Sequence, residues 1–333
     1  MYDVMTIGRS SIDLYSNNIG TPFHEIDSFN AYVGGSSTNI AVGCARLDLN
    51  AVLLTAVGDD KVGEFILHFL KKEKIPLEFI PVIKDKRSSA VLLGVQPPDC
   101  YPLVYYRDNA ADIFLTREDL DRIGVENCRM IVPSGTALSK NPSRDTINYG
   151  LHKAKQHDVQ VLLDLDFRKD QWQSIQDYQA SIFETAGYCD IILATTEEVL
   201  SAFDPNVDVS ITQQQISSPD VLGDLATSIE RCFQSGISSL VLKRGDQGAR
   251  IYYTPSRFED VPGFQVEVFN TLGAGDAFAA GFIKGFLSGW PMKKAVRYAN
   301  ACGAIVVTRH GCANFNPYAR EVSEFLNEYK DGL

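Results

Sequence analysis

The segment NTLGAGDAF, residues 270–278, decides how the rest of the chain is interpreted. Gly273, Ala274 and Gly275 carry little or no side chain, so their backbone N–H groups can approach an anion closely. The small-residue run that follows, AAGFIKGFL, is typical of a helix. The first turn of a helix offers free N–H donors and about half a positive charge. The segment therefore predicts a phosphate-binding site at a helix N-terminus.

Asp276 lies in the first turn of the same expected helix. One interpretation is that its carboxylate only stabilises the helix dipole. The other is that Asp276 faces the bound anion and accepts a proton from an attacking hydroxyl group. The sequence has no G-x-x-x-x-G-K-[ST] motif and no G-x-G-x-x-G motif after a strand. A phosphate site here would thus differ from the two common nucleotide loops.

The composition limits the partners of such a site. The chain has 333 residues, with 31 Lys and Arg against 42 Asp and Glu, and a formal net charge of −11. An acidic chain without basic runs lacks the clustered cations that bind nucleic acid or an anionic membrane surface. No apolar run approaches the about 20 residues of a membrane span, and the N-terminus lacks the basic region of a signal peptide. We expect a cytoplasmic protein.

Short apolar runs alternate with longer amphipathic stretches along the chain, which predicts an α/β fold with a mostly parallel sheet. The expected strands are residues 4–8, 52–57, 130–133, 159–165, 191–193 and 240–242. The expected helices are residues 39–47, 62–73, 144–157, 197–203, 222–235, 274–287 and 292–307.

Three segments depart from this alternation. Residues 12–33 and about 88–110 show strand-like patterns without a crossover helix. We expect them to form a small antiparallel sheet, a lid over the strand ends of the main sheet; ordinary surface hairpins are the alternative. The polar segment 204–219 is expected to be a surface insertion.

A second glycine motif, YVGGSSTNIAVGCARL, lies near the N-terminus. Gly34 and Gly35 allow a close approach to a ligand, and the amide of Asn39 can bind sugar hydroxyls. Upstream, in GRSSIDL, Asp13 follows a strand, and its carboxylate can accept two hydroxyl hydrogen bonds. The structural alternatives are a turn before a core helix and, for Asp13, a cap.

The motifs GGSSTNIA and NTLGAGDAF resemble, in order and separation, the two signatures of the ribokinase-like, or PfkB, carbohydrate kinases. The resemblance covers essentially the whole chain. It implies a single kinase domain, residues 1–333, folded as a three-layer α/β/α sandwich with a central, mostly parallel sheet and a small β-sheet lid. It also implies that the chain uses ATP and Mg²⁺ to phosphorylate a small polyol or sugar acid. Some relatives pair through their lid edges, so a homodimer of that kind is an open expectation.

The resemblance implies roles for the residues of both glycine motifs. Asp276 corresponds to the general base, and the backbone of residues 273–275 corresponds to the anion hole for the migrating phosphoryl group. The residues expected to meet the sugar hydroxyls are Asp13, Gly34, Gly35 and Asn39.

The nucleotide side follows from two further matches. The family's nucleotide loop corresponds to KRGDQG, where Gly245 and Gly248 allow backbone contact with ATP. Lys243 could pair with phosphate or be a solvated surface charge. The segment YANACGAIVVTRHG resembles the adenine-side helix and places Asn300 and Gly303 near the base.

The sequence departs from the family pattern at two positions. The N-x-x-E motif that orders Mg²⁺ and its waters reads Thr195 to Glu198, so Glu198 is expected to act on the metal through water. The aspartate that borders the monovalent-cation site of potassium-activated relatives is Asn270 here. Its missing charge argues against K⁺ as a cofactor.

Two arginines favour an anionic substrate. Arg107, in YYRDNAAD, and Arg168, in LLDLDFRKDQW, could hold a carboxylate or phosphate with two parallel hydrogen bonds; ion pairs within the protein are the alternative. These segments resemble kinases of 5-dehydro-2-deoxygluconate in myo-inositol breakdown, and also kinases of 2-keto-3-deoxygluconate. RSSIDLY and GGSSTNIAV favour the first. Fructokinase or ribokinase activity, which would not need Arg107, and a non-enzymatic sugar-binding protein are further alternatives.

Overall fold

A central sheet of eight strands organises the computed structural model, which describes residues 1–96, 100–210 and 220–329. The strand order is β16-β15-β14-β11-β10-β9-β1-β4. The six strands from β14 to β4 are parallel, and β15 and β16 form an antiparallel edge. The strands are β1 (Tyr2–Ile7), β4 (Ala51–Leu54), β9 (Cys128–Pro133), β10 (Gln160–Asp164), β11 (Ile191–Thr195), β14 (Ser239–Lys243), β15 (Ala249–Thr254) and β16 (Arg257–Val261).

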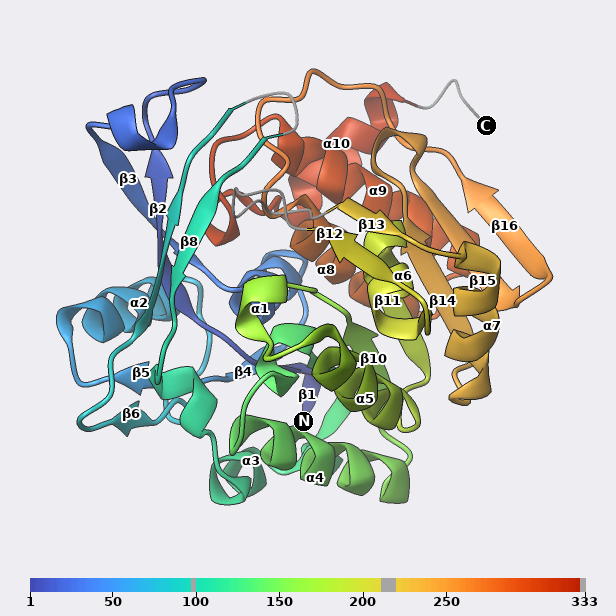
Figure 1. Ribbon diagram of the computed structural model, residues 1–333, viewed down its shortest axis with the longest axis horizontal. Coiled ribbons are helices and arrows are strands. Elements are labelled where there is room, and N and C mark those ends of the chain that lie inside the picture. The colour runs from blue at the N-terminus through green and yellow to red at the C-terminus, as the bar shows by residue number, and fades with distance from the viewer. Residues whose placement is uncertain (97–99, 211–219, 330–333) are drawn as a thin grey trace.

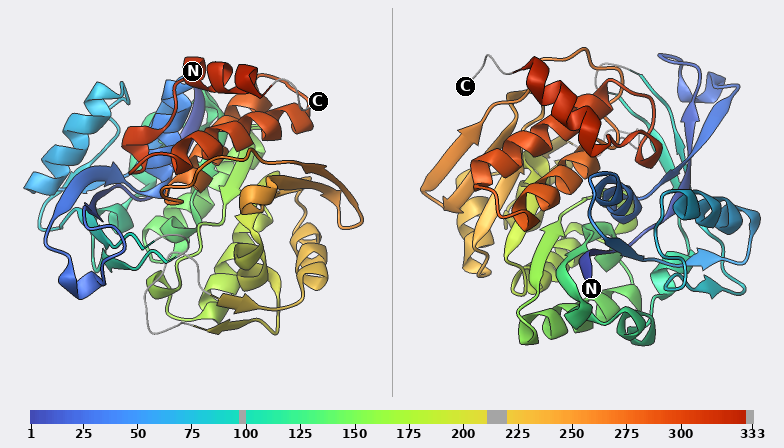
Figure 2. Two further views of the ribbon diagram at one scale, coloured as in Figure 1. Left: turned by 90° about the horizontal axis from the view of Figure 1, so that it is seen from above. Right: turned by 180° about the vertical axis from the view of Figure 1, so that it is seen from behind.

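Helices cover both faces of this sheet and make three layers (Figures 1 and 2). Successive residues of a strand point to opposite faces, so Leu162 belongs to one apolar core and Leu163 to the other. The first core is closed by α1 (Ser36–Arg46), α2 (Lys61–Lys72), α8 (Ala274–Leu287), α9 (Met292–Val307) and α10 (Ala319–Glu328). The second is closed by α3 (Arg117–Ile123), α4 (Ser143–Gln156), α5 (Ile175–Ala186), α6 (Thr196–Phe203) and α7 (Leu225–Gln234).

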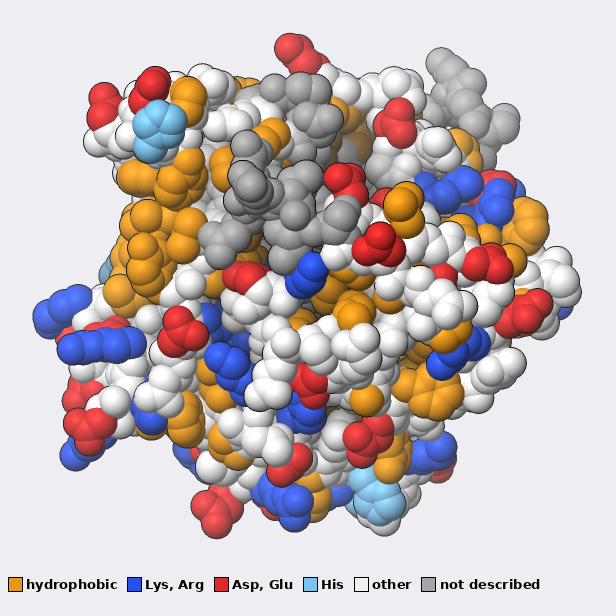
Figure 3. Space-filling model, in the orientation of Figure 1, with side chains coloured by type: hydrophobic (Ala, Val, Ile, Leu, Met, Phe, Trp, Pro, Cys, Tyr) orange, Lys and Arg blue, Asp and Glu red, His pale blue; other side chains and the backbone are white. Residues whose placement is uncertain are grey.

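A four-stranded sheet, which we call the lid, stands beside the main sheet at the upper left of Figure 1. Its order is β3-β2-β7-β8, with β2 (Ser11–Ser16), β3 (Phe29–Gly34), β7 (Ser89–Leu93) and β8 (Leu103–Tyr106). The central pair, β2 and β7, is parallel, which the sequence analysis did not predict. The chain leaves the lid after β3 and returns only after β4 and α2, so β7 can enter in the direction of β2. Apolar side chains gather on this side of the molecule (Figure 3), and Tyr106 is 60% exposed.

Two short ladders complete the sheets. The strands β5 (Val57–Gly58) and β6 (Val82–Ile83) are parallel, and β12 (Asp208–Ser210) and β13 (Asp220–Leu222) are antiparallel. The predicted insertion 204–219 thus includes β12, and its residues 211–219 lie outside the described part of the chain. Among the helices that the structure describes, none combines the length and the apolar character that a membrane crossing needs.

The predicted α/β class, the three layers and the lid are confirmed. The antiparallel edge, β15 and β16, was not predicted. In the run RFEDV of β16 polar residues outnumber apolar ones, because an edge strand buries little of its surface. Such a strand gives a weak hydrophobic pattern.

Candidate active site

The carboxyl ends of the parallel strands meet at one edge of the main sheet, where ligands bind in open α/β folds. Polar residues end these strands or follow them closely: Arg9, Ser134, Asp164, Asp166, Thr195 and Lys243. A cleft of about 570 Å³ opens beside this edge. The strand ends of β10, β11 and β14 line it together with the start of α8 and part of α9. The cleft therefore joins the predicted nucleotide loop to the predicted anion hole.

The start of α8 has the geometry of an anion hole. Gly273 precedes the helix with φ 84°, a left-handed conformation that favours glycine. The N–H of Ala274 donates to the carbonyl of Thr271 at 3.3 Å. Within the described residues, the N–H groups of Gly273 and Gly275 have no acceptor. Two of the three predicted donors are thus available to a ligand.

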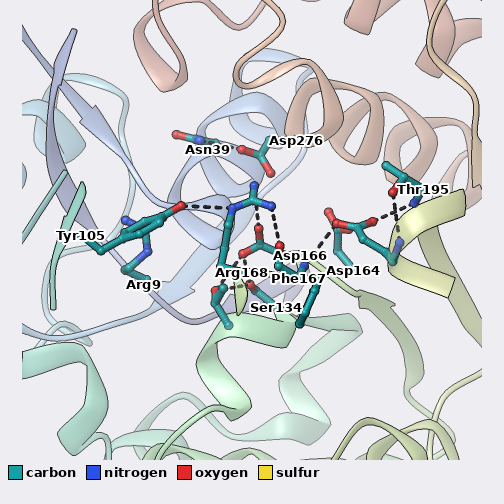
Figure 4. Close-up of polar contacts among 12 residues, drawn as sticks. Arg9, Asn39, Tyr105, Ser134, Asp164, Asp166, Phe167, Arg168, Thr195 and Asp276 are labelled. Atoms are coloured by element: carbon teal, nitrogen blue, oxygen red, sulfur yellow. Dashed lines mark hydrogen bonds and ion pairs between the residues drawn. The ribbon is translucent and has the colours of Figure 1, made fainter. Parts of the chain in front are cut away.

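Asp276 lies one residue further, at the cleft wall. Asn39 on α1 donates its Nδ2 hydrogen to Asp276 Oδ2 at 2.6 Å (Figure 4). Removal from water raises the pKa of Asp276, and the nearby charge of Asp166 adds to this, so that it reaches about 6. A carboxylate with this pKa is ionised at neutral pH and is a stronger base than an ordinary aspartate.

Lys243 supplies a fixed positive charge beside the anion hole. Its Nζ donates to Asp164 Oδ1 at 3.0 Å and lies 3.9 Å from Glu198 Oε2. A Cβ atom on Gly275 would lie 3.5 Å from the same Nζ, so the ammonium group reaches the start of α8. Burial alone would lower the pKa of Lys243, but the two carboxylates outweigh it and raise the pKa. Lys243 is therefore charged, and it is not a solvated surface residue.

Glu198 forms a capping box at the start of α6. Thr195 N–H donates to Glu198 Oε2 at 2.7 Å, and Glu198 N–H donates to Thr195 Oγ1 at 3.3 Å. The N–H of Phe167 donates to Glu198 Oε1 at 3.2 Å. The threonine that replaces the family's asparagine thus still caps the helix. No group of three or more candidate metal-ligating side chains occurs in residues 1–96, 100–210 and 220–329, so the metal role of Glu198 stays a prediction.

The predicted nucleotide residues line the far part of the cleft. A Cβ atom on Gly248, which has φ 81°, would overlap the carbonyl of Val261. Asn300 donates its Nδ2 hydrogens to the carbonyls of Val261 and Pro262, at 3.2 and 3.0 Å. Gly303, on α9, faces the start of α8, where a Cβ atom would lie 3.4 Å from the carbonyl of Ala274. These contacts hold the nucleotide loop and its surroundings together. Gly245, with φ 58°, has open space where a Cβ atom would project.

The predicted sugar residues meet at the junction of the lid and α1. A Cβ atom on Gly34 would overlap Asp13 Oδ2, and one on Gly35, which has φ 100°, would overlap the carbonyl of Arg9. Burial raises the pKa of Asp13, although Arg9 and a hydrogen bond from Ser11 at 2.6 Å lower it in part. The glycine pair therefore makes room for Asp13 and for the backbone of Arg9.

Arg107 does not join these residues, which corrects the predicted geometry. Its side chain is 2% exposed and pairs with Asp112 through Nε at 2.8 Å and Nη2 at 2.7 Å. Its Nη1 donates to the carbonyl of Thr136 at 3.2 Å and to Ser139 Oγ at 3.1 Å. The guanidinium group thus ties the exit of β8 to the loop after β9, which the structural alternative predicted.

Arg168 does reach the cleft. Its Nε donates to the hydroxyl of Tyr105 at 3.1 Å, its Nη1 to the carbonyl of Phe167 at 2.8 Å, and its Nη2 pairs with Asp166 at 3.1 Å (Figure 4). Burial would raise the pKa of Asp166. The charges of Arg168 and Arg9 and the hydrogen bonds from Ser134 and Thr136 outweigh this effect, so the pKa lies below its usual value. Asp166 is therefore ionised and orients Arg168.

The sequence analysis did not assign Arg9, Tyr105 and Asp166 to the site. Arg9 and Asp166 each follow a strand by two residues, and Tyr105 is the last residue but one of β8; nearness to a strand end was the signal available in the sequence. Arg9 is the first residue of RSSIDLY and directly follows an expected strand, where an isolated arginine looks like a surface residue. The structure instead buries it against the ring of Tyr105, with 5.1 Å from Cζ to the ring centroid.

Residues 1–319 match the sequence profile of the pfkB family carbohydrate kinases. The chain belongs to this family. Two curated relatives are named 5-dehydro-2-deoxygluconokinase. That of Geobacillus thermodenitrificans is 34% identical over 332 residues, 98% of this chain and 94% of the relative. That of Clostridium tetani is 32% identical over 330 residues, 99% of this chain and 94% of the relative.

Solved structures confirm the ribokinase-like fold of this PfkB kinase. A putative ribokinase II from E. coli, in complex with ATP and Mg²⁺, superimposes with a TM-score of 0.85 at 22% identity, covering 98% of this chain and all of that one. A fructokinase from Xylella fastidiosa with bound ATP has a TM-score of 0.83 at 19% identity, with 99% and 100% coverage.

Proposed function

We propose that this PfkB kinase transfers the γ-phosphoryl group of ATP to the terminal hydroxyl of 5-dehydro-2-deoxygluconate, in myo-inositol breakdown. The products are 6-phospho-5-dehydro-2-deoxygluconate and ADP. The names of the curated relatives support the substrate. The observation that carries the chemistry is Asp276, a carboxylate with a raised pKa beside the unpaired N–H groups of Gly273 and Gly275.

The reaction requires one proton transfer and a fixed alignment. Asp276 accepts the proton of the terminal hydroxyl, whose oxygen attacks the γ-phosphorus; the bond from the γ-phosphorus to the bridging oxygen breaks, and ADP leaves. Negative charge develops on the migrating group next to the N–H donors of Gly273 and Gly275. Lys243 adds a positive charge there. Phosphoryl transfer depends mainly on such positioning and charge stabilisation.

The residues present fit a magnesium ion held largely through water. Each carboxylate oxygen of Glu198 accepts one backbone N–H, and its remaining lone pair can accept a hydrogen bond from a metal-bound water. When bound, Mg²⁺ neutralises the nucleotide phosphates. Asn270 is buried and uncharged, and its Nδ2 has no partner in the described part of the chain. We therefore expect activity without K⁺, because this amide cannot supply the carboxylate charge of potassium-activated relatives.

Unpaired polar atoms support sugar binding at the lid junction. Asn39 uses its Nδ2 on Asp276, while its Oδ1 is buried with no partner among the described residues. A substrate hydroxyl next to the one that reacts can donate to this oxygen. Asp13 can accept a further hydroxyl. Arg168, which lines the cleft, can contact the substrate or the transferring phosphoryl group.

The test is ADP release measured with 5-dehydro-2-deoxygluconate, 2-keto-3-deoxygluconate, fructose and ribose, each with and without K⁺. We expect the highest kcat/KM with 5-dehydro-2-deoxygluconate and no dependence on K⁺. A higher value with 2-keto-3-deoxygluconate would move the assignment to that acid. Preference for fructose or ribose would contradict an acid substrate. If none of the four compounds supported ADP release, the assignment as a kinase of any of them would be wrong.

A homodimer through the lid edges is part of the same proposal. The exposed apolar side chains on the lid, Tyr106 among them, support it (Figure 3). Light scattering of the purified protein measures the mass in solution, and a monomer across micromolar concentrations would contradict the pairing.

A further inference from the structure

Arg9 is a buried cation with no carboxylate in direct contact among the described residues. The residue is 6% exposed and follows β1. Its Nη1 donates to Ser11 Oγ at 2.8 Å, and within the described ranges no carboxylate oxygen lies within 4.0 Å of its guanidinium group. The two arginines discussed above each have such a partner, Asp112 for Arg107 and Asp166 for Arg168. The charges of Asp13 and Asp166 compensate for the burial of Arg9 from a distance, but its guanidinium group has no direct anionic partner among the described residues, so this position can receive an anion.

The free nitrogens of Arg9 remain within reach of a ligand. A guanidinium group has five N–H donors, and the side chain of Arg9 makes one hydrogen bond to the described residues. Nε and Nη2 have no hydrogen-bond partner among the described residues, and neither atom is fully sealed from solvent. A small polar group can therefore contact them without a rearrangement of the core.

The surroundings place Arg9 beside the predicted sugar residues. Ser11 accepts a hydrogen bond from Arg9 and donates one to Asp13 Oδ1 at 2.6 Å, so one hydroxyl links the two side chains. The carbonyl of Arg9 accepts from Thr38 Oγ1 at 3.1 Å and abuts Gly35. The glycine motif thus contacts both the backbone of Arg9 and the side chain of Asp13.

Arg9 and Arg168 contact different parts of Tyr105. The guanidinium of Arg9 lies over the ring, while Arg168 binds the hydroxyl (Figure 4). The charge of Asp166 raises the pKa of Arg9 and that of Asp276, so both side chains lie near this one carboxylate. This arrangement suits a short chain with a reactive hydroxyl at one end and a negative charge at the other.

We propose that Arg9 binds the carboxylate of the substrate and thereby selects sugar acids over neutral sugars. This inference rests on the proposed kinase function and refines it. The fork of Arg9 can donate two parallel hydrogen bonds to one carboxylate, the geometry that arginine favours. The bound substrate then completes the ion pair that the protein leaves open, which Arg107 and Arg168 do not need.

The experiment compares Arg9→Met with the unaltered enzyme on two substrates. One is 5-dehydro-2-deoxygluconate; the other is its neutral analogue with –CH₂OH in place of the carboxylate. We expect Arg9→Met to lower kcat/KM for the acid by about 10- to 100-fold, the range for a lost hydrogen bond to a charged group, chiefly through KM. For the analogue we expect a change of less than about threefold. Equal losses on both substrates, or no loss on the acid, would overturn the proposal.

Thermal unfolding separates this role from a structural one. Because the charge of Arg9 favours the ionised forms of buried Asp13 and Asp166, Arg9→Met is expected to lower the melting temperature moderately, while its loss of kcat/KM stays confined to the acid. A lower melting temperature together with equal losses on both substrates would assign Arg9 to the structure alone. Arg9→Lys keeps the charge without the fork, and we expect its kcat/KM for the acid to lie between those of Arg9→Met and the unaltered enzyme. If the unaltered enzyme does not phosphorylate the acid, the proposed function fails first, independently of Arg9.

Discussion

The predicted nucleotide side and the predicted sugar side of the site differ in which groups line them. On the nucleotide side, Gly245, Gly248 and Gly303 leave space along the cleft, and backbone N–H groups are the donors at the start of α8. On the sugar side, buried charged side chains, Arg9 and Asp13 among them, contact one another directly or through hydroxyl groups. Backbone N–H groups can bind a phosphate whatever molecule carries it. To distinguish one small sugar from another, a site needs side chains of particular charge and length.

Asp276 lies where the two sides meet, and its removal should have the largest effect. Asp276→Asn is expected to lower kcat by at least about 10²-fold, because the amide cannot accept the hydroxyl proton. The raised pKa of Asp276 means that the fold disfavours its ionised form, so the variant should not lower the melting temperature at pH 8. Steady-state ADP release and thermal unfolding check both statements. Near-normal turnover would exclude Asp276 as the base.

Lys243 places a positive charge between the predicted nucleotide loop and the start of α8. Lys243→Met should lower kcat/KM for ATP by about 10- to 100-fold, because it removes a charge from the phosphate site. It should also destabilise the fold, by up to about 3–5 kcal/mol, since buried Asp164 loses its counter-ion.

The double variant Lys243→Met/Asp164→Asn is the matched control. It removes both charges, so the melting temperature should recover while kcat/KM for ATP stays low. Recovery of both quantities would show that Lys243 acts only on stability.

Two alanine substitutions probe the sides separately. Gly34→Ala places a methyl group against Asp13 and should raise KM for the sugar acid about tenfold, with little change in KM for ATP. Gly248→Ala places one against the carbonyl of Val261 at a left-handed φ and should raise KM for ATP by a similar factor. The test is to measure KM for the sugar acid and KM for ATP in each of the two variants. If each variant raised both values equally, the two sides would not be independent.

The pH dependence should give the smallest effect. With a pKa of about 6, Asp276 is half protonated near pH 6, and only its ionised form accepts a proton. We therefore expect kcat/KM for the sugar acid to fall about twofold between pH 8 and pH 6, and about tenfold per unit below pH 5. The profile is measured at saturating Mg·ATP. A constant value down to pH 5 would contradict the raised pKa.

The sequence predicted the α/β layers and the anion hole because both depend on local patterns. Apolar runs that alternate with amphipathic stretches identify buried parallel strands. The backbone donors of the predicted anion hole come from consecutive small residues around Gly273, so a short stretch of sequence is enough to identify them. The resemblance to a known family then identified Asp276 and the glycines of the nucleotide loop. The weakly apolar edge strand β16 was missed because its side chains are largely exposed.

Only the tertiary structure decided which of three arginines has no carboxylate in direct contact among the described residues. Arg9, Arg107 and Arg168 look alike in the sequence, since each stands next to a strand and near an acidic residue. The partners of a charged side chain come from several elements, and its pairing depends on separations of a few ångströms that sequence spacing does not determine. Folding pairs Arg107 with Asp112 and Arg168 with Asp166, and leaves Arg9 buried beside Asp13 with donors to spare. The sequence alone predicted a backbone phosphate site at a helix start; only the fold showed which arginine has donors free for the second negative charge that we propose.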